Sequence, residues 1–186
     1  LFRPDEHQAV LAYDLSVHPS ARVLSHTDYW GTRVDAFGVR EPHVALEIVA
    51  TAAVEVAPRP RMTASPRRAD LLDPTFHDAH REHLARSRHV DWGAEVAATA
   101  ERLVAAAGDD VVDAVLAVHR FVHTSLEYTP GATYIGVDVD RVMADARGVC
   151  QDYSHLAIAL CRAAGIPARY VSGYFFAASD ASGDDA

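Results

Sequence analysis

Hydrophobic and polar positions alternate over short stretches in the first third of the chain, a pattern typical of β-strands with one inward face. The alternation is clearest at residues 9–15, 21–26, 32–39 and 43–56, and the last stretch is long enough for one or two strands. Strands at roughly ten-residue spacing predict an antiparallel, sandwich-like β-region over residues 1–57. We expect this region to support the rest of the chain rather than to carry chemistry.

Residues 58–90 interrupt the pattern with frequent proline and arginine, which is typical of a connection between domains. Within it His77, His80 and His83 follow at three-residue steps and would share one broad flank of a helix. Such a set can bind a divalent metal, but no cysteine or carboxylate completes a recognised site. A solvated helix surface explains the three histidines as well, so we predict no metal site there.

From residue 91 the apolar positions recur at three- and four-residue steps, the period of a helix with one buried face. This spacing predicts one helix over residues 92–107, ending at Gly108, and a second that opens at Asp109 and stops near residues 128–131. A short helix over residues 139–146 would deliver the chain to Gly148. The whole segment 91–186 therefore reads as a helical and strand core, which makes the predicted fold class α+β.

His119 and His123 stand four residues apart in the second predicted helix, which is a metal-ligand spacing. Arg120, however, occupies the place where a zinc protease would carry glutamate. We therefore predict a structural role for both histidines and no metal or organic cofactor.

A further helical pattern begins at Cys150, and Gly165 and Pro167 end it. Cys150 then lies in the first helical turn, where unpaired backbone N–H groups and the helix dipole favour a thiolate over a thiol. The same N–H groups can stabilise a developing oxyanion. Residues 168–176, dense in Tyr, Val and Phe, predict a strand, and residues 177–186 form a small-residue, acidic tail.

Composition limits the possible functions. The chain has 186 residues, of which 49% are hydrophobic and 23% charged, which is ordinary for a globular protein. Its net charge of −9 disfavours a nucleic-acid partner. No apolar run reaches the length of a membrane helix and the first residues do not have the form of a signal peptide, so we expect a cytoplasmic location and no membrane partner. All the basic residues are arginine, so the chain offers no lysine for self-cross-linking.

The two cysteines are eleven residues apart on the same predicted helix. At a rise of about 1.5 Å per residue they are separated by roughly 16 Å, well beyond the ~7 Å Cα distance that a disulfide tolerates. We expect Cys161 to be a buried core thiol, which leaves Cys150 as the candidate nucleophile.

Residues 148–153, continued by residues 159–174, resemble the transglutaminase-like superfamily, and more narrowly its bacterial cysteine protease branch. The resemblance implies a papain-like Cys-His-Asp site with Cys150 as the nucleophile. In that family the histidine and aspartate follow on later strands, so we expect the core to be incomplete at Ala186. Residues 35–38 and 43–56 are similar to the β-region that often precedes the bacterial enzymes.

Residues 128–133 also resemble the segment that precedes the nucleophile in this family. An aromatic side chain there borders the site in related enzymes, which implies Tyr128 or Tyr134 as a site-lining or oxyanion residue. Gln151, beside the cysteine, is a further candidate of the same kind. Core packing is the structural alternative for the two tyrosines.

No base for the thiol is evident after Cys150. His155 lies about 140° around the helix and roughly 7.5 Å along it, out of reach of the sulfur. Asp152 points about 160° away, and its carboxylate would oppose thiolate formation. An earlier histidine would have to meet Cys150 through the fold, and with eleven histidines such a meeting is easy to suggest. We therefore expect the chain alone to lack turnover.

The sequence thus predicts thiol-dependent acyl transfer on amide or peptide bonds of a protein or peptide substrate, as in a cysteine protease, amidase or transglutaminase. The alternative is a non-catalytic scaffold or peptide-binding module that keeps the fold, and a third hypothesis is a histidine metal protein. The strand at residues 168–176 would expose an edge, which favours self-association.

Overall fold

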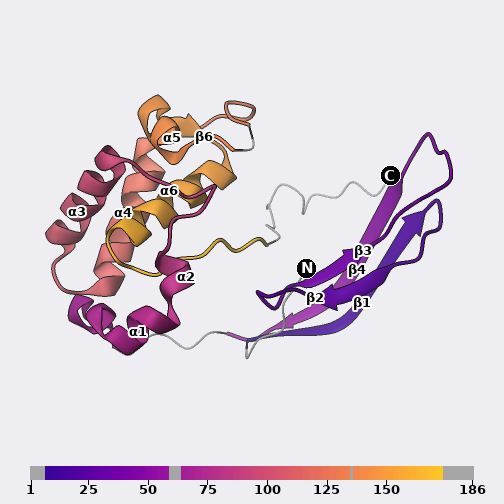
Figure 1. Cartoon of the computed structure of the whole chain (residues 1–186), viewed down its shortest axis with the longest axis horizontal. Coiled ribbons are helices and arrows are strands. Elements are labelled where there is room, and N and C mark those ends of the chain that lie inside the picture. Colours follow the sequence, from indigo (N-terminus) through magenta and orange to yellow (C-terminus); the bar gives the residue numbers. More distant parts are fainter. Residues whose placement is uncertain (1–6, 59–63, 135, 174–186) are drawn as a thin grey trace. The chain divides into compact units, whose positions relative to one another are not determined.

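The structure, a computed structural model, describes residues 7–58, 64–134 and 136–173. These residues divide into two compact units, one of residues 7–58 with 172–173 and one of residues 64–134 with 136–171. Figure 1 shows that the first unit contains the long strands and the second contains the helices. The α+β class predicted from the sequence is confirmed.

Four antiparallel strands form two separate ladders in the β unit. The first strand pairs with the fourth, with a bulge at residues 10–12, and the second pairs with the third. The strands are β1 Gln8–His18, β2 Leu24–Thr27, β3 Arg33–Ala36 and β4 Glu47–Val56. The antiparallel strands are thus as predicted, but in the described residues they form two-stranded ladders.

Polar side chains link the two ladders at Asp35. The hydroxyls of Ser25 and Tyr13 donate to its carboxylate, and the Arg33 Nε donates to it at 3.2 Å. The Ser25 hydrogen bond is the largest of the causes that hold the pKa of Asp35 below its usual value. Arg33 also lies 4.6 Å from the ring centroid of Tyr13, so β1 and β3 share a cation–π contact.

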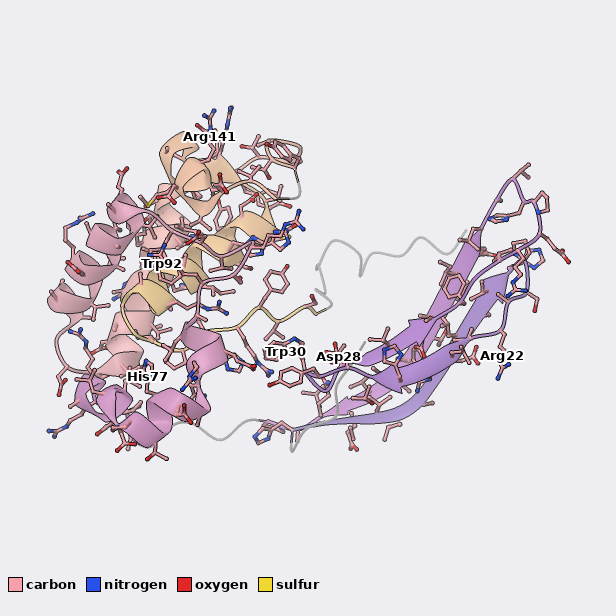
Figure 2. The ribbon with its side chains drawn as sticks, in the orientation of Figure 1. Arg22, Asp28, Trp30, His77, Trp92 and Arg141 are labelled. Atoms are coloured by element: carbon pink, nitrogen blue, oxygen red, sulfur yellow. The ribbon has the colours of Figure 1, made fainter. Side chains whose placement is uncertain are left out.

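The turn between β2 and β3 is built on Asp28, which Figure 2 labels together with Trp30. Its carboxylate accepts from the N–H groups of Trp30 and Thr32 at 2.9 and 2.8 Å. Gly31 adopts a positive φ of 77°, which a side chain would make costly. An aspartate followed by a glycine three positions later therefore sets this turn.

Seven helices make up the described part of the helical unit. They are η1 Arg68–Leu72, α1 Pro74–Ala79, α2 Arg81–Leu84, α3 Ala94–Ala107, α4 Val111–Ser125, α5 Val139–Asp145 and α6 Cys150–Ala163. The three long helices, α3, α4 and α6, pack against one another (Figure 1). Their facing side chains form the core, in which Leu156, Leu160, Val96, Val104 and Val118 are essentially inaccessible to solvent.

The boundary between α3 and α4 follows the predicted stop and start signals closely. Gly108 ends α3 with a φ of 80°. Asp110 caps α4, accepting from the Asp113 N–H at 3.0 Å and from the Ser65 hydroxyl at 2.6 Å. The Ser65 bond, followed by the Asp113 bond, lowers the pKa of Asp110. The second helix accordingly begins at Val111, because Asp109 and Asp110 serve as its entry rather than its first turn.

His77, His80 and His83 do not share one continuous helix. His77 is in α1 and His83 in α2, while His80 is the residue at which the chain breaks between them. Asp73 caps α1 by accepting from the Thr75 and Phe76 N–H groups. The common helical flank expected for the three histidines is therefore wrong, because a six-residue and a four-residue helix replace a single one.

The strand predicted at residues 168–176 does not form in residues 168–173; residues 174–176 lie outside the described part of the chain. A strand needs a partner for its backbone groups. Here the Ala168 N–H donates to the His83 carbonyl at 2.9 Å. The Ala168 carbonyl accepts from the Arg162 guanidinium at 2.7 and 2.9 Å. The described residues 168–173 therefore offer no edge strand of the kind on which the predicted self-association depends.

Within residues 7–58, 64–134 and 136–173, no helix is both long and apolar enough to span a membrane.

Candidate active site

The backbone approach to the cysteine is fixed by a short parallel ladder. β5 Glu127–Tyr128 pairs with β6 Arg147–Gly148, directly before α6. The Thr129 N–H extends the pairing by donating to the Gly148 carbonyl at 3.0 Å. Ala146 ends α5 in the left-handed region at φ 52°, which turns the chain into this ladder. The loop after Tyr128 and the start of α6 are therefore held side by side.

Cys150 is the first residue of α6, as the sequence predicted, and it is exposed and not in a disulfide. Its sulfur has no hydrogen-bond partner within the described residues. The N–H groups of Cys150 and Gln151 likewise find no acceptor among those residues. An exposed cysteine thus lies at the positive end of a helix of fourteen residues, together with two N–H donors that have no acceptor among the described residues.

Asp152 is the site residue whose role the sequence did not reveal. Only 6% of its surface is exposed. Its Oδ2 accepts from the Val149 N–H at 2.8 Å and from the Thr133 hydroxyl at 2.6 Å. A carboxylate at the third helical position that reaches back to the cap N–H is half of a capping box, and this was the available sequence signal. Asp152 therefore points into the protein, joining α6 to the loop before it.

Gly148 makes room for this carboxylate. A Cβ at Gly148 would lie 2.7 Å from the Asp152 Cβ and 2.8 Å from its Oδ2. The Asp152 Cβ cannot move aside without its backbone, and the Oδ2 is held by its two hydrogen bonds, so separations this short are not easily relieved. The glycine two residues before the cysteine is thus required by the buried aspartate.

The tyrosines predicted near the site are exposed. Tyr128 is 60% and Tyr134 78% exposed, so neither packs in the core. Tyr128 pairs with Gly148 in the β5–β6 ladder, and Tyr134 follows Thr133, which bonds to Asp152. The Tyr153 hydroxyl donates to the Leu126 carbonyl at 2.6 Å, and its ring centroid lies 6.4 Å from that of Tyr128. Both predicted tyrosines thus lie on segments attached to the start of α6.

The His155 ring lies against two other rings and makes no hydrogen bond to the Cys150 sulfur. Its centroid is 6.1 Å from that of His89 and 5.5 Å from that of Tyr170. Burial lowers the pKa of His155, the neighbouring His89 lowers it further, and the charge of Asp152 acts in the opposite direction. The histidine is therefore favoured in its neutral form.

Cys161 contrasts with Cys150. It is 7% exposed and belongs to the core, as expected. Burial raises the pKa of Cys161 from its ordinary value of 9.0 to about 11, because the thiolate would lose its hydration. The two thiols on α6 therefore differ in the property that decides reactivity, which is access to water.

No group of three or more His, Cys, Asp or Glu side chains among the described residues is placed to hold a metal ion. His119 and His123 lie on α4 with stacked rings 6.5 Å apart.

Elsewhere, a cavity of about 570 Å³ is lined by Phe76, His80, His83, Ile166 and Pro167 among others. These residues lie near the C-terminal end of α6, roughly 20 Å along the helix from Cys150, so the cavity is separate from the candidate site. Figure 2 marks the α1 side of this unit with His77 and the α5 side with Arg141.

Family comparisons cover both units. The transglutaminase-like superfamily matches residues 97–186, which include Cys150 and Asp152. The bacterial transglutaminase-like N-terminal region matches residues 3–55. The segment between these matches contains η1, α1 and α2.

Relatives of similar sequence include an uncharacterized protein of Mycobacterium leprae, 32% identical over 96% of this chain. Uncharacterized proteins of Mycobacterium bovis and Mycobacterium tuberculosis are 32% identical over 90% of it. The chain spans 63% of the length of the first and 55% of the others.

Among solved structures, the chain is similar to that described as "a Putative Cysteine Protease from Cytophaga hutchinsonii". The TM-score is 0.67 at 23% identity, over 89% of this chain and 56% of that one. At this identity the likeness concerns the fold. Residues 97–186 thus belong to the transglutaminase-like superfamily, and residues 3–55 form the bacterial transglutaminase-like N-terminal region that precedes it.

Proposed function

We propose that this protein catalyses thiol-dependent acyl transfer on amide or peptide bonds, with Cys150 as the nucleophile. The observation that supports this most directly is the exposed Cys150 at the first position of α6, where the N–H groups of Cys150 and Gln151 have no acceptor among the described residues. A helix start stabilises the thiolate that attacks and the oxyanion that forms. Membership in the transglutaminase-like superfamily supports the same chemistry.

The proposed reaction has two steps. The Cys150 thiolate adds to the substrate carbonyl carbon, and the carbonyl electrons move to oxygen, where the Cys150 and Gln151 N–H groups donate hydrogen bonds. The C–N bond then breaks, and the amine leaves with a proton from an imidazolium, which gives a thioester on Cys150. Water or an amine attacks the thioester while the imidazole accepts its proton, and the acyl product leaves as the thiolate re-forms.

We infer that the imidazole is supplied from outside this sequence. All eleven histidines lie in the described residues, and none is hydrogen-bonded to the Cys150 sulfur. The resemblance implies a histidine and an aspartate downstream of the cysteine helix, and the chain spans only 55–63% of its mycobacterial relatives. The substrate is proposed to be a protein or peptide that lies along the exposed Tyr128 and Tyr134.

The test is alkylation of the folded chain with iodoacetamide across pH, followed by mass-spectrometric mapping. We expect Cys150 to be labelled already at about pH 6, whereas the same cysteine in urea should follow an ordinary thiol midpoint near about pH 8.5. Cys161 is the matched control within the chain, because its burial keeps it a thiol. Identical profiles for Cys150 in the folded and unfolded chain would contradict an activated thiolate.

A non-catalytic peptide-binding module is the alternative, favoured by the lack of a hydrogen-bonded base at Cys150 in the described residues. Peptide amide hydrolysis separates the two functions. We expect no turnover from this chain, and turnover from the longer protein that disappears in the Cys150→Ser variant. If the longer protein hydrolyses no peptide, and binds peptides equally well with and without the Cys150→Ser substitution, the module is supported instead.

A further inference from the structure

We propose that Asp152 is a positioning residue for Cys150, holding the start of α6 and the loop of residues 129–134 in one arrangement through a single carboxylate oxygen. The inference rests on the proposed role of Cys150 as the nucleophile. It assigns to Asp152 a part in the site that is distinct from attack, proton transfer or oxyanion binding.

The contacts that carry the proposal all converge on the Asp152 Oδ2. The Val149 N–H at 2.8 Å belongs to the residue before the cysteine, and the Thr133 hydroxyl at 2.6 Å belongs to the loop. The Asp152 N–H in turn donates to the Val149 carbonyl at 2.8 Å. Cys150 therefore lies inside a closed ring of hydrogen bonds between residues 149 and 152.

In this arrangement some N–H groups at the helix start make structural hydrogen bonds, and others remain available to a substrate. Asp152 uses the Val149 N–H, and its own N–H is bound to Val149. The N–H groups of Cys150 and Gln151 are left over, and these are the two donors that the proposed oxyanion requires. A fixed first turn holds both in place before substrate arrives, which avoids the cost of ordering them during the reaction.

Electrostatics alone would argue against a carboxylate here. A negative charge two residues from the sulfur opposes thiolate formation, and a carboxylate that is only 6% exposed loses most of its hydration. The two short hydrogen bonds to the charged Oδ2 offset this loss. The room made by Gly148 shows that the backbone accommodates the aspartate at a specific place.

The charge and the positioning of Asp152 act on Cys150 in opposite directions, so two uncharged variants separate them. Asp152→Asn keeps an acceptor oxygen for Val149 and Thr133 but removes the charge. Asp152→Ala removes both. The readout is the pH midpoint of Cys150 alkylation by iodoacetamide in the full chain, with the helical circular dichroism signal and protection of Cys161 as measures of folding.

We expect Asp152→Asn to move the midpoint down by about half to one pH unit, because a like charge is removed. Asp152→Ala should lie above Asp152→Asn by about half a pH unit, because a frayed first turn no longer stabilises the thiolate. Equal midpoints for the Asn and Ala variants would overturn the positioning role and leave only the effect of charge.

Thr133 provides a second pair that keeps the carboxylate and does not depend on the folding of Asp152→Ala. Thr133→Val removes the hydroxyl donor and Thr133→Ser retains it. We expect Thr133→Val to raise the alkylation midpoint by a few tenths of a pH unit and Thr133→Ser to leave it within about 0.1, since a carboxylate with one donor less holds the turn less firmly. Equal midpoints for Val and Ser would contradict the proposal.

Neither pair alters the other ionisable groups on the elements packed against α6. On β5, α5, β6 and α6 itself these include Glu127, Tyr128, Asp140, Arg141, Asp145, Arg147, Tyr153 and His155, and on α3 and α4 they include Glu95, Glu101, Arg102, Asp113, His119, Arg120 and His123. The wild-type profile distinguishes the two proposals. An ordinary midpoint in the wild-type chain would overturn the proposed function. A low wild-type midpoint that none of the four variants moves would overturn only the role of Asp152.

Discussion

The helical unit and the β unit are each stabilised internally by a different kind of interaction. In the helical unit, α3, α4 and α6 bury a continuous set of aliphatic side chains. In the β unit no residue from 7 to 58 is buried, and Leu11, Ile48 and Val56 are 51–69% exposed. The β ladders rest on backbone hydrogen bonds and on the polar contacts at Asp35. Apolar burial, the larger stabilising contribution in folding, is therefore concentrated in one unit.

This difference bears on the site, because the contacts that position Cys150 among the described residues are made inside the helical unit. The β5–β6 ladder, Asp152, Thr133 and Gly148 all lie within residues 62–171. We therefore expect the geometry of the candidate site to depend on the stability of the helical core.

The largest expected effect is on the helical core. Leu156→Ala removes a side chain that is 0% exposed and should lower the free energy of unfolding of the helical unit by about 2–5 kcal/mol. Leu11→Ala in β1, where the side chain is 66% exposed, should change the free energy of unfolding of the β unit by less than about 0.5 kcal/mol. Urea unfolding followed by circular dichroism, with the helical signal for the first variant and the β-sheet signal for the second, measures both. Similar losses in the two variants would contradict the contrast between the units.

A smaller effect should appear in alkaline solution, and again only in the helical unit. The pKa of Cys161 is raised from 9.0 to about 11 in the folded protein. Burial of the neutral thiol therefore contributes fully to the free energy of unfolding below about pH 9, and this contribution is lost as pH rises toward about 11. A pKa difference of this size corresponds to roughly 2–3 kcal/mol. The loss should appear in urea unfolding at a series of pH values.

Cys161→Ala is the matched variant for this measurement. Its cavity lowers the stability at every pH, but the additional fall between about pH 9 and 11 should vanish, because the titrating thiol is gone. If the same fall persists in Cys161→Ala, another group is responsible.

The third effect concerns space around the backbone. Gly148→Ala would force a Cβ to within 2.7 Å of Asp152, and we expect a loss of about 1–3 kcal/mol in the stability of the helical unit. Gly38 in the β unit has no atom within 4 Å of the same position, so Gly38→Ala should change the stability by less than about 0.5 kcal/mol. Thermal unfolding of both variants compares them directly. A tolerated alanine at 148 would show that Asp152 can move aside.

Local sequence signals accounted for most of the elements. The alternation in residues 9–56 predicted the antiparallel strands, and the apolar spacing with Gly108, Asp110 and Gly165 predicted the long helices. Cys150 at a helix start follows from the same kind of signal. These features depend on residues that are neighbours in the chain, which is why a linear pattern is enough to find them.

Two predictions failed where a local pattern did not decide the outcome. Residues 168–173 have the composition of a strand, yet His83 and Arg162 take the hydrogen bonds of Ala168. His77, His80 and His83 have helical spacing, yet the chain breaks at His80. For residues 168–173 the outcome was set by the groups that the fold brought alongside, and for the histidines the helical spacing was correct but the helix was interrupted.

The sequence by itself determined that this protein is α+β, that α6 begins at Cys150, and that the two cysteines stay apart, because each of these depends on the period of one element. Only the tertiary structure decided that Asp152 turns inward to Thr133, nineteen residues earlier, and that Tyr128 and Tyr134 remain exposed. A hydrogen bond between segments and the exposure of a side chain depend on packing in three dimensions, which no periodicity along the chain records.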